Sequence, residues 1–257
     1  MDGKRVCVVI PIYRKLHKWE EVALRHNLSV LDKYKSFLVY PEGFDAGTMH
    51  EEYPQLGLIK VSDGWLGSKN GIQGYNAMML SERFYALFEA YDYMLICHVD
   101  AWIFRDDLAL WCQKGYDLVA APWPTRPFYR TLVGKLWLRI KLFFKPKDEI
   151  YHCQLFGKVG NGGLSLRRIS AFREACRTYA DKLNYYRNKY RDNEDVLWAV
   201  VPSFKVPSEK AALGFAFDNK PSICFRLNGD TLPMGCHGFN HKNRYKFWKR
   251  YIAVSLQ

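Results

Sequence analysis

Short apolar runs alternate with amphipathic stretches along the first two thirds of the chain. The runs are rich in β-branched and aromatic residues, as in buried parallel strands. They are Val6–Ile10, Ser36–Tyr40, Leu58–Val61, Tyr93–Cys97 and Leu118–Ala121. Between them, Trp19–Leu31 and Ala77–Ala90 carry apolar residues at helical spacing. This alternation predicts an α/β protein with a central, mostly parallel sheet flanked by helices.

In such sheets, ligands bind beyond the carboxyl ends of the strands. Pro11–Arg14, His98–Asp100 and Pro122–Thr125 each follow a predicted strand. We therefore expect these three segments to converge on one cleft. No internal repeat or low-complexity linker divides the chain, so residues 1–257 are predicted to form a single domain. Within it, residues 122–150 are predicted to be an insertion before the sheet resumes near Lys158–Leu166.

The composition supplies a sizeable core, because 49% of the 257 residues are hydrophobic and 16% are aromatic. The seven cysteines are odd in number and form no CxxC pair, which indicates neither a zinc site nor a disulfide framework. A reducing compartment is the simplest interpretation. The first apolar run is too short for a signal peptide, and no apolar stretch could span a bilayer. We expect a soluble or peripherally bound cytoplasmic protein.

The net charge of +12 is unevenly distributed. No acid occurs between Leu118 and Lys147 or after Asp230, whereas lysine and arginine are frequent in both segments. Such patches attract phosphates, nucleic acid or anionic lipid. In the first of them, Thr131–Lys145 combines bulky apolar and basic residues, which predicts a basic amphipathic helix for a membrane surface. A core helix with snorkelling lysines is the open alternative.

Three later segments carry candidate chemistry. In His98–Asp100, a carboxylate at a strand end could hold a divalent cation that bridges a nucleotide diphosphate, or could simply cap a turn. The glycines of Gly160–Gly163 allow a close approach of backbone to a sugar, or form a tight turn. Glu194 and Asp195 open a predicted helix, where one of them could serve only as favourable charge at the N-terminus.

In their order and spacing, these segments resemble the motifs of GT-A glycosyltransferases. His98–Asp100 resembles a degenerate Asp-x-Asp metal motif with histidine in the first position. Asp100–Leu108, Gly162–Leu166 and Glu194–Val196 resemble the motifs that follow in fringe-type and core-1 β1,3-glycosyltransferases. From Val6 to Phe239 the chain is still more similar to a bacterial GT-A family encoded in surface-polysaccharide clusters.

The resemblance implies a single Rossmann-like GT-A domain and a metal-dependent, inverting sugar transfer. The implied donor is a UDP-sugar, with UDP-galactose as the first candidate, and the acceptor is lipid-linked (polyprenyl diphosphate) or an oligosaccharide. Asp195 would be the base that takes the acceptor proton, and Glu194 would orient the acceptor or support the loop. Asp100 and His237 would hold Mn²⁺ or Mg²⁺. For His237, a loop position that contacts phosphate or nothing stays open.

The expected substrate contacts follow from the same resemblance. Tyr13 would stack on the base and Arg14 would reach a phosphate. The full donor set is Pro11, Tyr13, Arg14, Asp63, Lys69, Asn76, His98 and Asp100. The acceptor set is Trp123, Asn161, Gly162 and Gly163. The enzyme would be peripheral on the inner face of the cytoplasmic membrane, with residues 122–150 facing the acceptor or the membrane.

Three alternatives remain from the sequence. A GT-A transferase could retain the anomeric configuration, and a nucleotidyltransferase could use the same type of sheet. A basic nucleic-acid-binding module would also combine aromatic residues with lysine and arginine. The basic runs, however, contain long aliphatic stretches and no nucleic-acid-binding fingerprint, so we expect no nucleic-acid partner.

Overall fold

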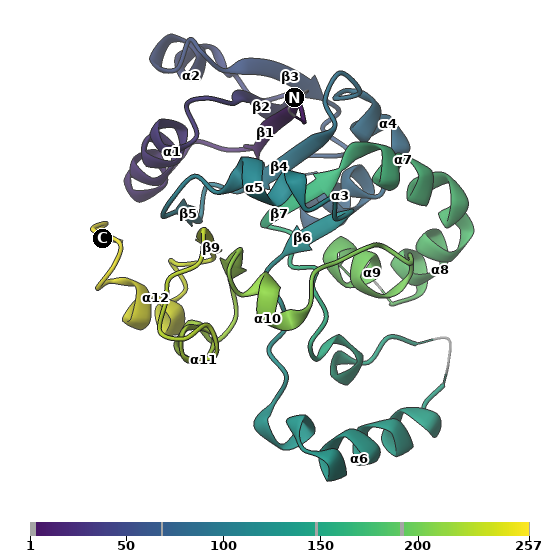
Figure 1. The fold of residues 1–257 in the computed structure, drawn as a ribbon. Coiled ribbons are helices and arrows are strands. Elements are labelled where there is room, and N and C mark those ends of the chain that lie inside the picture. Colours follow the sequence, from purple (N-terminus) through teal and green to yellow (C-terminus); the bar gives the residue numbers. More distant parts are fainter. Residues whose placement is uncertain (1–3, 68, 147–148, 191–192, 257) are drawn as a thin grey trace.

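A six-stranded sheet forms the centre of the molecule, with strand order β3-β2-β1-β4-β7-β6 (Figure 1). The computed structural model describes residues 4–67, 69–146, 149–190 and 193–256. The strands of the sheet are β1 Val6–Pro11, β2 Lys35–Pro41, β3 Gly57–Val61, β4 Tyr93–Cys97, β6 Leu118–Ala120 and β7 Leu164–Arg168. Strands β1 to β4 pair in parallel, whereas β7 is antiparallel to both β4 and β6. The predicted mostly parallel α/β sheet is confirmed, and all five predicted strands are present.

Helices cover both faces of this sheet, because successive side chains of a strand point to opposite sides. Val8 and Ile10 of β1 pack in one core cluster with Leu24 of α1. Cys7 and Val9 pack in a second cluster with the helices of the other face. The main covering helices are α1 Lys18–Val30, α3 Gly71–Met79, α4 Glu82–Ala86, α7 Ile169–Thr178, α8 Ala180–Tyr190 and α9 Glu194–Val200. Smaller elements are α2 Gly47–Glu52, α5 Leu108–Gln113, α10 Glu209–Ala212 and η2 His152–Leu155.

The predicted helix Ala77–Ala90 is wrong in its bounds. Helix α3 begins earlier, at Gly71, and ends at Met79. Ser81 then has an extended backbone, with φ −96° and ψ 125°, and α4 starts at Glu82. The apolar spacing persists across the break because both helices cover the same face, so periodicity alone conceals the interruption.

A second, three-stranded sheet of order β5-β9-β8 was not predicted. Its strands are β5 Ala101–Ile103, β8 Ala216–Phe217 and β9 Gly235–His237, each too short to give a periodic signal. Helices α11 Pro221–Leu227 and α12 Lys242–Trp248 pack near it around a third core cluster. Trp248 is fully buried in this cluster and stacks on Phe104, with ring centroids 5.6 Å apart.

Helix α6 Leu132–Phe143 projects away from the sheets in Figure 1 and packs on η1 Pro127–Arg130. Thr131 caps the helix, since its hydroxyl oxygen accepts a hydrogen bond of 3.0 Å from the Gly134 N–H. Gly134 is the buried residue of α6, while Leu132 is 84% exposed and Phe143 81% exposed. The alternative of a core helix with snorkelling lysines is therefore wrong. Within the described residues, no helix is long and apolar enough to cross a membrane.

The third core cluster yields a stability test with a matched control. Trp248→Ala should lower the free energy of unfolding by about 3–5 kcal/mol, because it removes a fully buried indole and leaves a cavity. Trp137→Ala on α6, where the indole is 55% exposed, should cost much less. Urea unfolding followed by circular dichroism measures both. Equal losses of unfolding free energy would show that α6 is packed in solution or that the third core cluster is not.

Candidate active site

A cavity of about 390 Å³ opens where β1 and β4 end side by side. The chain connections leave these two strands toward opposite edges of the sheet, so this is the switch point at which α/β proteins bind ligands. Pro11–Arg14 and His98–Asp100 line the cavity, and two of the three predicted strand ends therefore converge. The third segment, Pro122–Thr125, is not among the lining residues.

Pairing between β5 and β9 brings Asp100 next to His237, which is far away in the sequence. Strand β4 ends at Cys97, and a turn follows in which the Ala101 N–H donates to the His98 carbonyl at 3.0 Å. Ala101 then lies opposite His237 in the antiparallel pair. As a result, His237 Nε2 lies 3.2 Å from Asp100 Oδ1. The turn and this pairing together build the contact.

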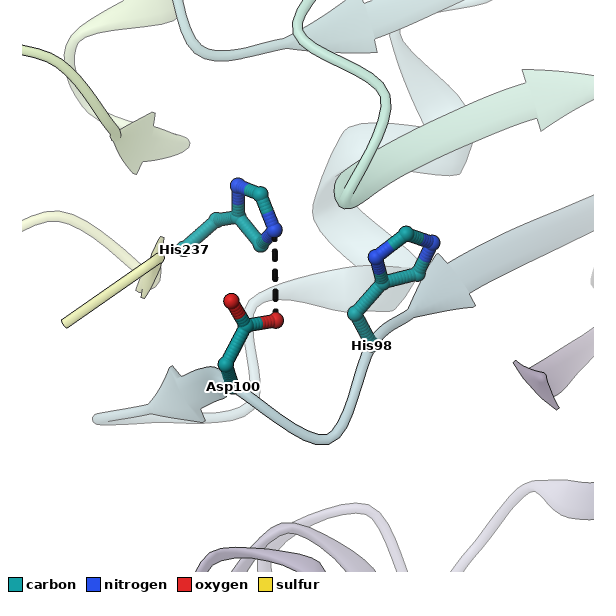
Figure 2. A group of neighbouring side chains, drawn as sticks. All are labelled: His98, Asp100 and His237. Carbon is teal, nitrogen blue, oxygen red and sulfur yellow. Dashed lines mark ion pairs between the residues drawn. The ribbon is translucent and has the colours of Figure 1, made fainter. Parts of the chain in front are cut away.

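His98, Asp100 and His237 form a cluster with the geometry of a metal site (Figure 2). One donor atom from each lies within 4.8 Å of the other two. Donors held about 2.1 Å from one ion lie about 3–4 Å apart, so a small inward movement would suffice. Figure 2 shows the three side chains turned toward one another, with one ring nitrogen of His98 facing the Asp100–His237 pair. Two imidazoles and a carboxylate suit a divalent transition metal ion.

The outer nitrogens of both imidazoles have partners, as metal-binding histidines usually do. His237 Nδ1 lies 3.2 Å from Asp218 Oδ1, and His98 Nε2 lies 2.7 Å from the Tyr75 hydroxyl oxygen. Asp218 is itself 3% exposed and accepts hydrogen bonds from Asn161 and Arg244. The residues present therefore fit a metal ion, with Asp218 and Tyr75 fixing the orientation of its two histidines.

Burial and neighbouring charges shift the pKa values of all three side chains in the cluster. Burial, together with the charge of the neighbouring His237, lowers the pKa of His98 to about 4. Burial would also lower the pKa of His237, but Asp100 and Asp218 outweigh it and raise that pKa to about 10. Burial would raise the pKa of Asp100, yet His237 holds it well below its usual range. A bound cation would take the place of the His237 proton beside Asp100.

The glycine segment Gly160–Gly163 packs between this cluster and the helix that carries the acidic pair. A Cβ atom on Gly163 would lie 2.0 Å from His237 Nε2, and one on Gly162 would lie 2.3 Å from Glu194 Oε1. Neither glycine has a positive φ, so close approach is the reason for glycine here. Trp123 borders the same segment, since a Cβ on Gly160 would lie 2.8 Å from its ring. The acceptor contacts of this segment stay a prediction.

Glu194 forms a buried ion pair with Arg167. Arg167 Nη2 lies 3.1 Å and 3.3 Å from the two carboxylate oxygens, and the side chains are 1% and 3% exposed. Burial would lower the pKa of Arg167, but Glu194 outweighs this and keeps it above its usual range. Glu194 is therefore engaged with Arg167, and its two predicted roles, acceptor orientation or loop support, stay predictions.

Asp195 lies one residue further on, and within the residues that the structure describes it forms no such ion pair. Its Oδ1 accepts a 2.8 Å hydrogen bond from the Val196 N–H at the start of α9. Burial, together with the charge of Glu194, raises the pKa of Asp195 to about 7. A carboxyl group that titrates near neutral pH is suited to act as a general base.

The predicted donor residues fall into two groups. Besides His98 and Asp100, the cavity is lined by Pro11, Tyr13 and Arg14. Tyr13 is 51% exposed, and Arg14 forms an ion pair with buried Glu20 at 2.7 Å.

The second group lies outside the cavity lining and consists of Asp63, Lys69 and Asn76. Asp63 Oδ1 accepts from the Gly43 N–H at 2.8 Å, and Asn76 Oδ1 accepts from the Glu194 N–H at 3.2 Å. Both side chains hold backbone in place.

Sequence reasoning missed Asp218 and gave Arg167 no role. Asp218 follows the apolar segment Phe215–Phe217, so it carried the same signal as Asp100, an acid after a buried strand. Strand β8 has only two residues, too few for that pattern to be noticed. Arg167 lies in a buried strand, where a charged residue indicates a buried partner.

Comparison with known proteins defines the fold as that of GT-A glycosyltransferases. The galactosyltransferase LgtC, solved with donor and acceptor sugar analogues, superposes with a TM-score of 0.58 at 11% identity, covering 97% of this chain and 96% of that chain. Apo mouse xyloside xylosyltransferase 1 gives a TM-score of 0.55 at 9% identity, covering 93% and 99%. No curated protein matches by sequence. Residues 55–237 match the family described as "Protein of unknown function (DUF5672)", and the chain belongs to this family.

The buried ion pair permits a test of loop support. Arg167→Met should cost about 3–5 kcal/mol of unfolding free energy, because it leaves the Glu194 charge buried without a cation. Arg177→Met removes an ion pair whose arginine is 63% exposed and should cost less than about 1 kcal/mol. Adding Glu194→Gln to Arg167→Met should recover part of the loss. Urea denaturation measures all three, and a double variant no more stable than Arg167→Met would contradict the buried-charge explanation.

Proposed function

We propose that this protein is a metal-dependent glycosyltransferase that transfers a sugar from a UDP-sugar. The observation that carries the proposal is the His98–Asp100–His237 cluster, of which His98 and Asp100 line a cavity at the switch point of the sheet. A nucleotide diphosphate needs three things there: a cleft for the base and ribose, a cation for the phosphates, and room for the sugar. The cavity of about 390 Å³ has the size of a small-molecule site.

Different residues of the chain would bind the base, the phosphates and the metal ion of such a donor. Tyr13 offers an exposed ring for stacking against a base, and Arg14 lies beside it with its guanidinium 5.9 Å from the ring centroid. His98, Asp100 and His237 would hold the ion, which when bound neutralises the charge that develops on the leaving diphosphate. Asp218 and Tyr75 keep the two imidazoles in position.

Asp195 is proposed as the base of an inverting transfer. Inversion by direct displacement requires a group that takes the acceptor hydroxyl proton during the attack on the anomeric carbon. Asp195 is supported by its raised pKa of about 7 and by its position on α9, whose first turn meets the glycine segment beside His237. Asp195 is not among the residues that line the cavity, so the acceptor would approach from the α9 side of that segment.

The identity of the substrates rests on the motif resemblance. Galactose as the transferred sugar, a polyprenyl-diphosphate-linked or oligosaccharide acceptor, and a place in bacterial surface-polysaccharide synthesis belong to the proposal on that basis. Mn²⁺ is the first candidate ion, because the cluster contains two imidazoles.

Turnover measurements with a panel of UDP-sugars test the proposal. With Mn²⁺ and an acceptor panel, UDP release should be seen with one donor, UDP-galactose first, and its rate should rise with pH to a plateau above about 7, because Asp195 must lose its proton. Asp195→Asn should reduce the rate by about 10²–10⁴-fold while donor binding, followed by thermal shift, is retained. Asp181→Asn, at an exposed position of α8, is the matched control and should leave the rate unchanged.

Each competing activity has its own outcome in these assays. Pyrophosphate release in place of UDP would identify a nucleotidyltransferase. If proton NMR shows that the product keeps the donor's anomeric configuration, the transfer is retaining and not inverting. Full turnover by the Asp195→Asn variant would show that Asp195 is not the base. Donor binding would then be assessed from the thermal-shift measurement alone.

The exposed face of α6 supports a further part of the proposal, peripheral binding to an anionic membrane. At about 100° per residue, the exposed apolar side chains cover an arc of about 140°, with Arg139 and Lys141 at its borders. They are Leu132, Val133, Leu136, Trp137, Ile140 and Phe143. Leu138 and Leu142, which are less exposed, lie on the other side of the helix. Apolar side chains flanked by cations match a surface of acyl chains and anionic headgroups.

Vesicle binding tests this membrane surface. The protein should sediment with phosphatidylglycerol vesicles and be released by salt, but should not sediment with pure phosphatidylcholine. Leu132→Ser with Phe143→Ser should abolish sedimentation, because both side chains are more than 80% exposed and contribute little to folding. Leu110→Ser on α5, at 56% exposure, is the control. Sedimentation that survives the double variant, or a concentration-dependent dimer that the same variant abolishes, would contradict membrane binding through α6.

A further inference from the structure

Helix α9 carries Asp195 in its first turn, and the start of this helix is held by a side chain from another helix. The Glu194 N–H donates a hydrogen bond of 3.2 Å to Oδ1 of Asn76, which belongs to α3. We propose that Asn76 is a positioning residue for Asp195, because it fixes the point at which α9 begins. The inference rests on the proposed role of Asp195 as the base and names the side chain on which its placement depends.

The cap of α9 gives the first argument. The first N–H groups of a helix have no partner within the helix, so a side chain usually supplies one. The N-cap residue of α9 is Asn193, whose own side chain makes no capping hydrogen bond, although its carbonyl accepts from the Val196 N–H at 3.1 Å. Asn76 Oδ1 takes the Glu194 N–H instead, and Asn76 Nδ2 donates to Asn193 Oδ1 at 3.3 Å. One amide from α3 therefore holds both residues that precede Asp195.

The burial of Asn76 gives the second argument. The residue is 1% exposed, so its amide must find its partners inside the protein. It finds them at the start of α9, on Asn193 and Glu194. A shift of α9 would leave the Asn76 amide and the Glu194 N–H buried without partners, which costs more than an ordinary hydrogen bond contributes. The start of α9 is thus set by α3 as well as by its own sequence.

The neighbouring residue on α3 contacts the other half of the candidate site. Tyr75 lines the cavity, and its hydroxyl oxygen lies 2.7 Å from His98 Nε2. Successive residues of a helix point about 100° apart, so Tyr75 and Asn76 reach different neighbours from one turn. Helix α3 therefore fixes the position of α9 relative to the cavity. This spacing matters for transfer, because a misplacement of about 1 Å can cost on the order of 10²-fold in rate.

Amide hydrogen exchange of the full chain, followed by NMR, tests the capping contact without any substrate. Asn76→Ala should speed the exchange of the Glu194 N–H by at least about 10-fold, because this N–H loses its acceptor. Asn76→Asp keeps an oxygen acceptor and should retain most of the protection. Asn228→Ala is the matched control, since it removes a 2.8 Å hydrogen bond from an asparagine side chain to the Thr231 carbonyl and should leave Glu194 unaffected. Equal exchange at Glu194 in the wild type and in Asn76→Ala would overturn the inference.

Turnover tests the positioning role itself. Asn76→Ala should lower kcat by about 10- to 100-fold and leave the donor KM unchanged, because Asn76 does not line the cavity. Asn76→Asp should recover most of the rate when each variant is compared on its high-pH plateau, since the added charge raises the pKa of Asp195. In an Asp195→Asn background, Asn76→Ala should have little further effect, because the group through which Asn76 acts is already absent.

The outcomes separate this inference from the proposed function. A rise in donor KM, an additive loss in the double variant, or an Asn76→Asp variant as slow as Asn76→Ala would overturn the positioning role. If Asn76→Ala unfolds too early to assay, Asn76→Ser serves for the same comparisons, because its shorter side chain also withdraws the acceptor. Faster exchange at Glu194 in a protein that uses no UDP-sugar would overturn the proposed function and leave the cap of α9 by Asn76 standing.

Discussion

The close packing of the Gly160–Gly163 segment is the constraint on which the rest of the site depends. A Cβ atom at Gly163 or Gly162 would lie within 2.3 Å of His237 or Glu194, far below any contact that real side chains make. The segment therefore brings two distant parts of the chain together, the second sheet with its histidine and helix α9 with its acids. Since β7 starts directly after it, the central sheet fixes where both parts meet.

The buried acids around this segment differ in the groups that contact them. Asp218 accepts hydrogen bonds from Asn161 and Asn219 at 2.5 and 2.7 Å, and lies against Arg244 and His237. Glu194 faces Arg167. Both acids are charge-paired and hold structure, as buried carboxylates must. Asp195 has a backbone N–H instead, and its pKa is raised to about 7. Adjacent acids on one helix thus lie in different electrostatic surroundings.

The sequence predicted the parts of the fold that have a periodic or buried signature. The strands ending near Pro11 and Cys97 were predictable from continuous apolar runs, and the strand-end rule then placed Pro11–Arg14 and His98–Asp100 at one cleft. Strands β5, β8 and β9 have three residues or fewer and carry no periodicity, so the contact between Asp100 and His237 came from motif resemblance and not from pattern. The break at Ser81 and the antiparallel direction of β7 depend on tertiary packing, which no local window contains.

The charges around the His98–Asp100–His237 cluster suit the proposed binding of a divalent ion beside a diphosphate. Asp100 is the one carboxylate among the three donors, and the negative charge of Asp218 behind His237 is balanced by Arg244. An additional carboxylate in place of His98 would bind the ion more strongly but would repel the phosphates at short range, where Coulomb energies are large in a partly buried site. Neutral imidazoles reduce that repulsion. In the proposed donor complex, the three side chains would hold the ion, and the donor's own oxygens would supply the remaining negative charge.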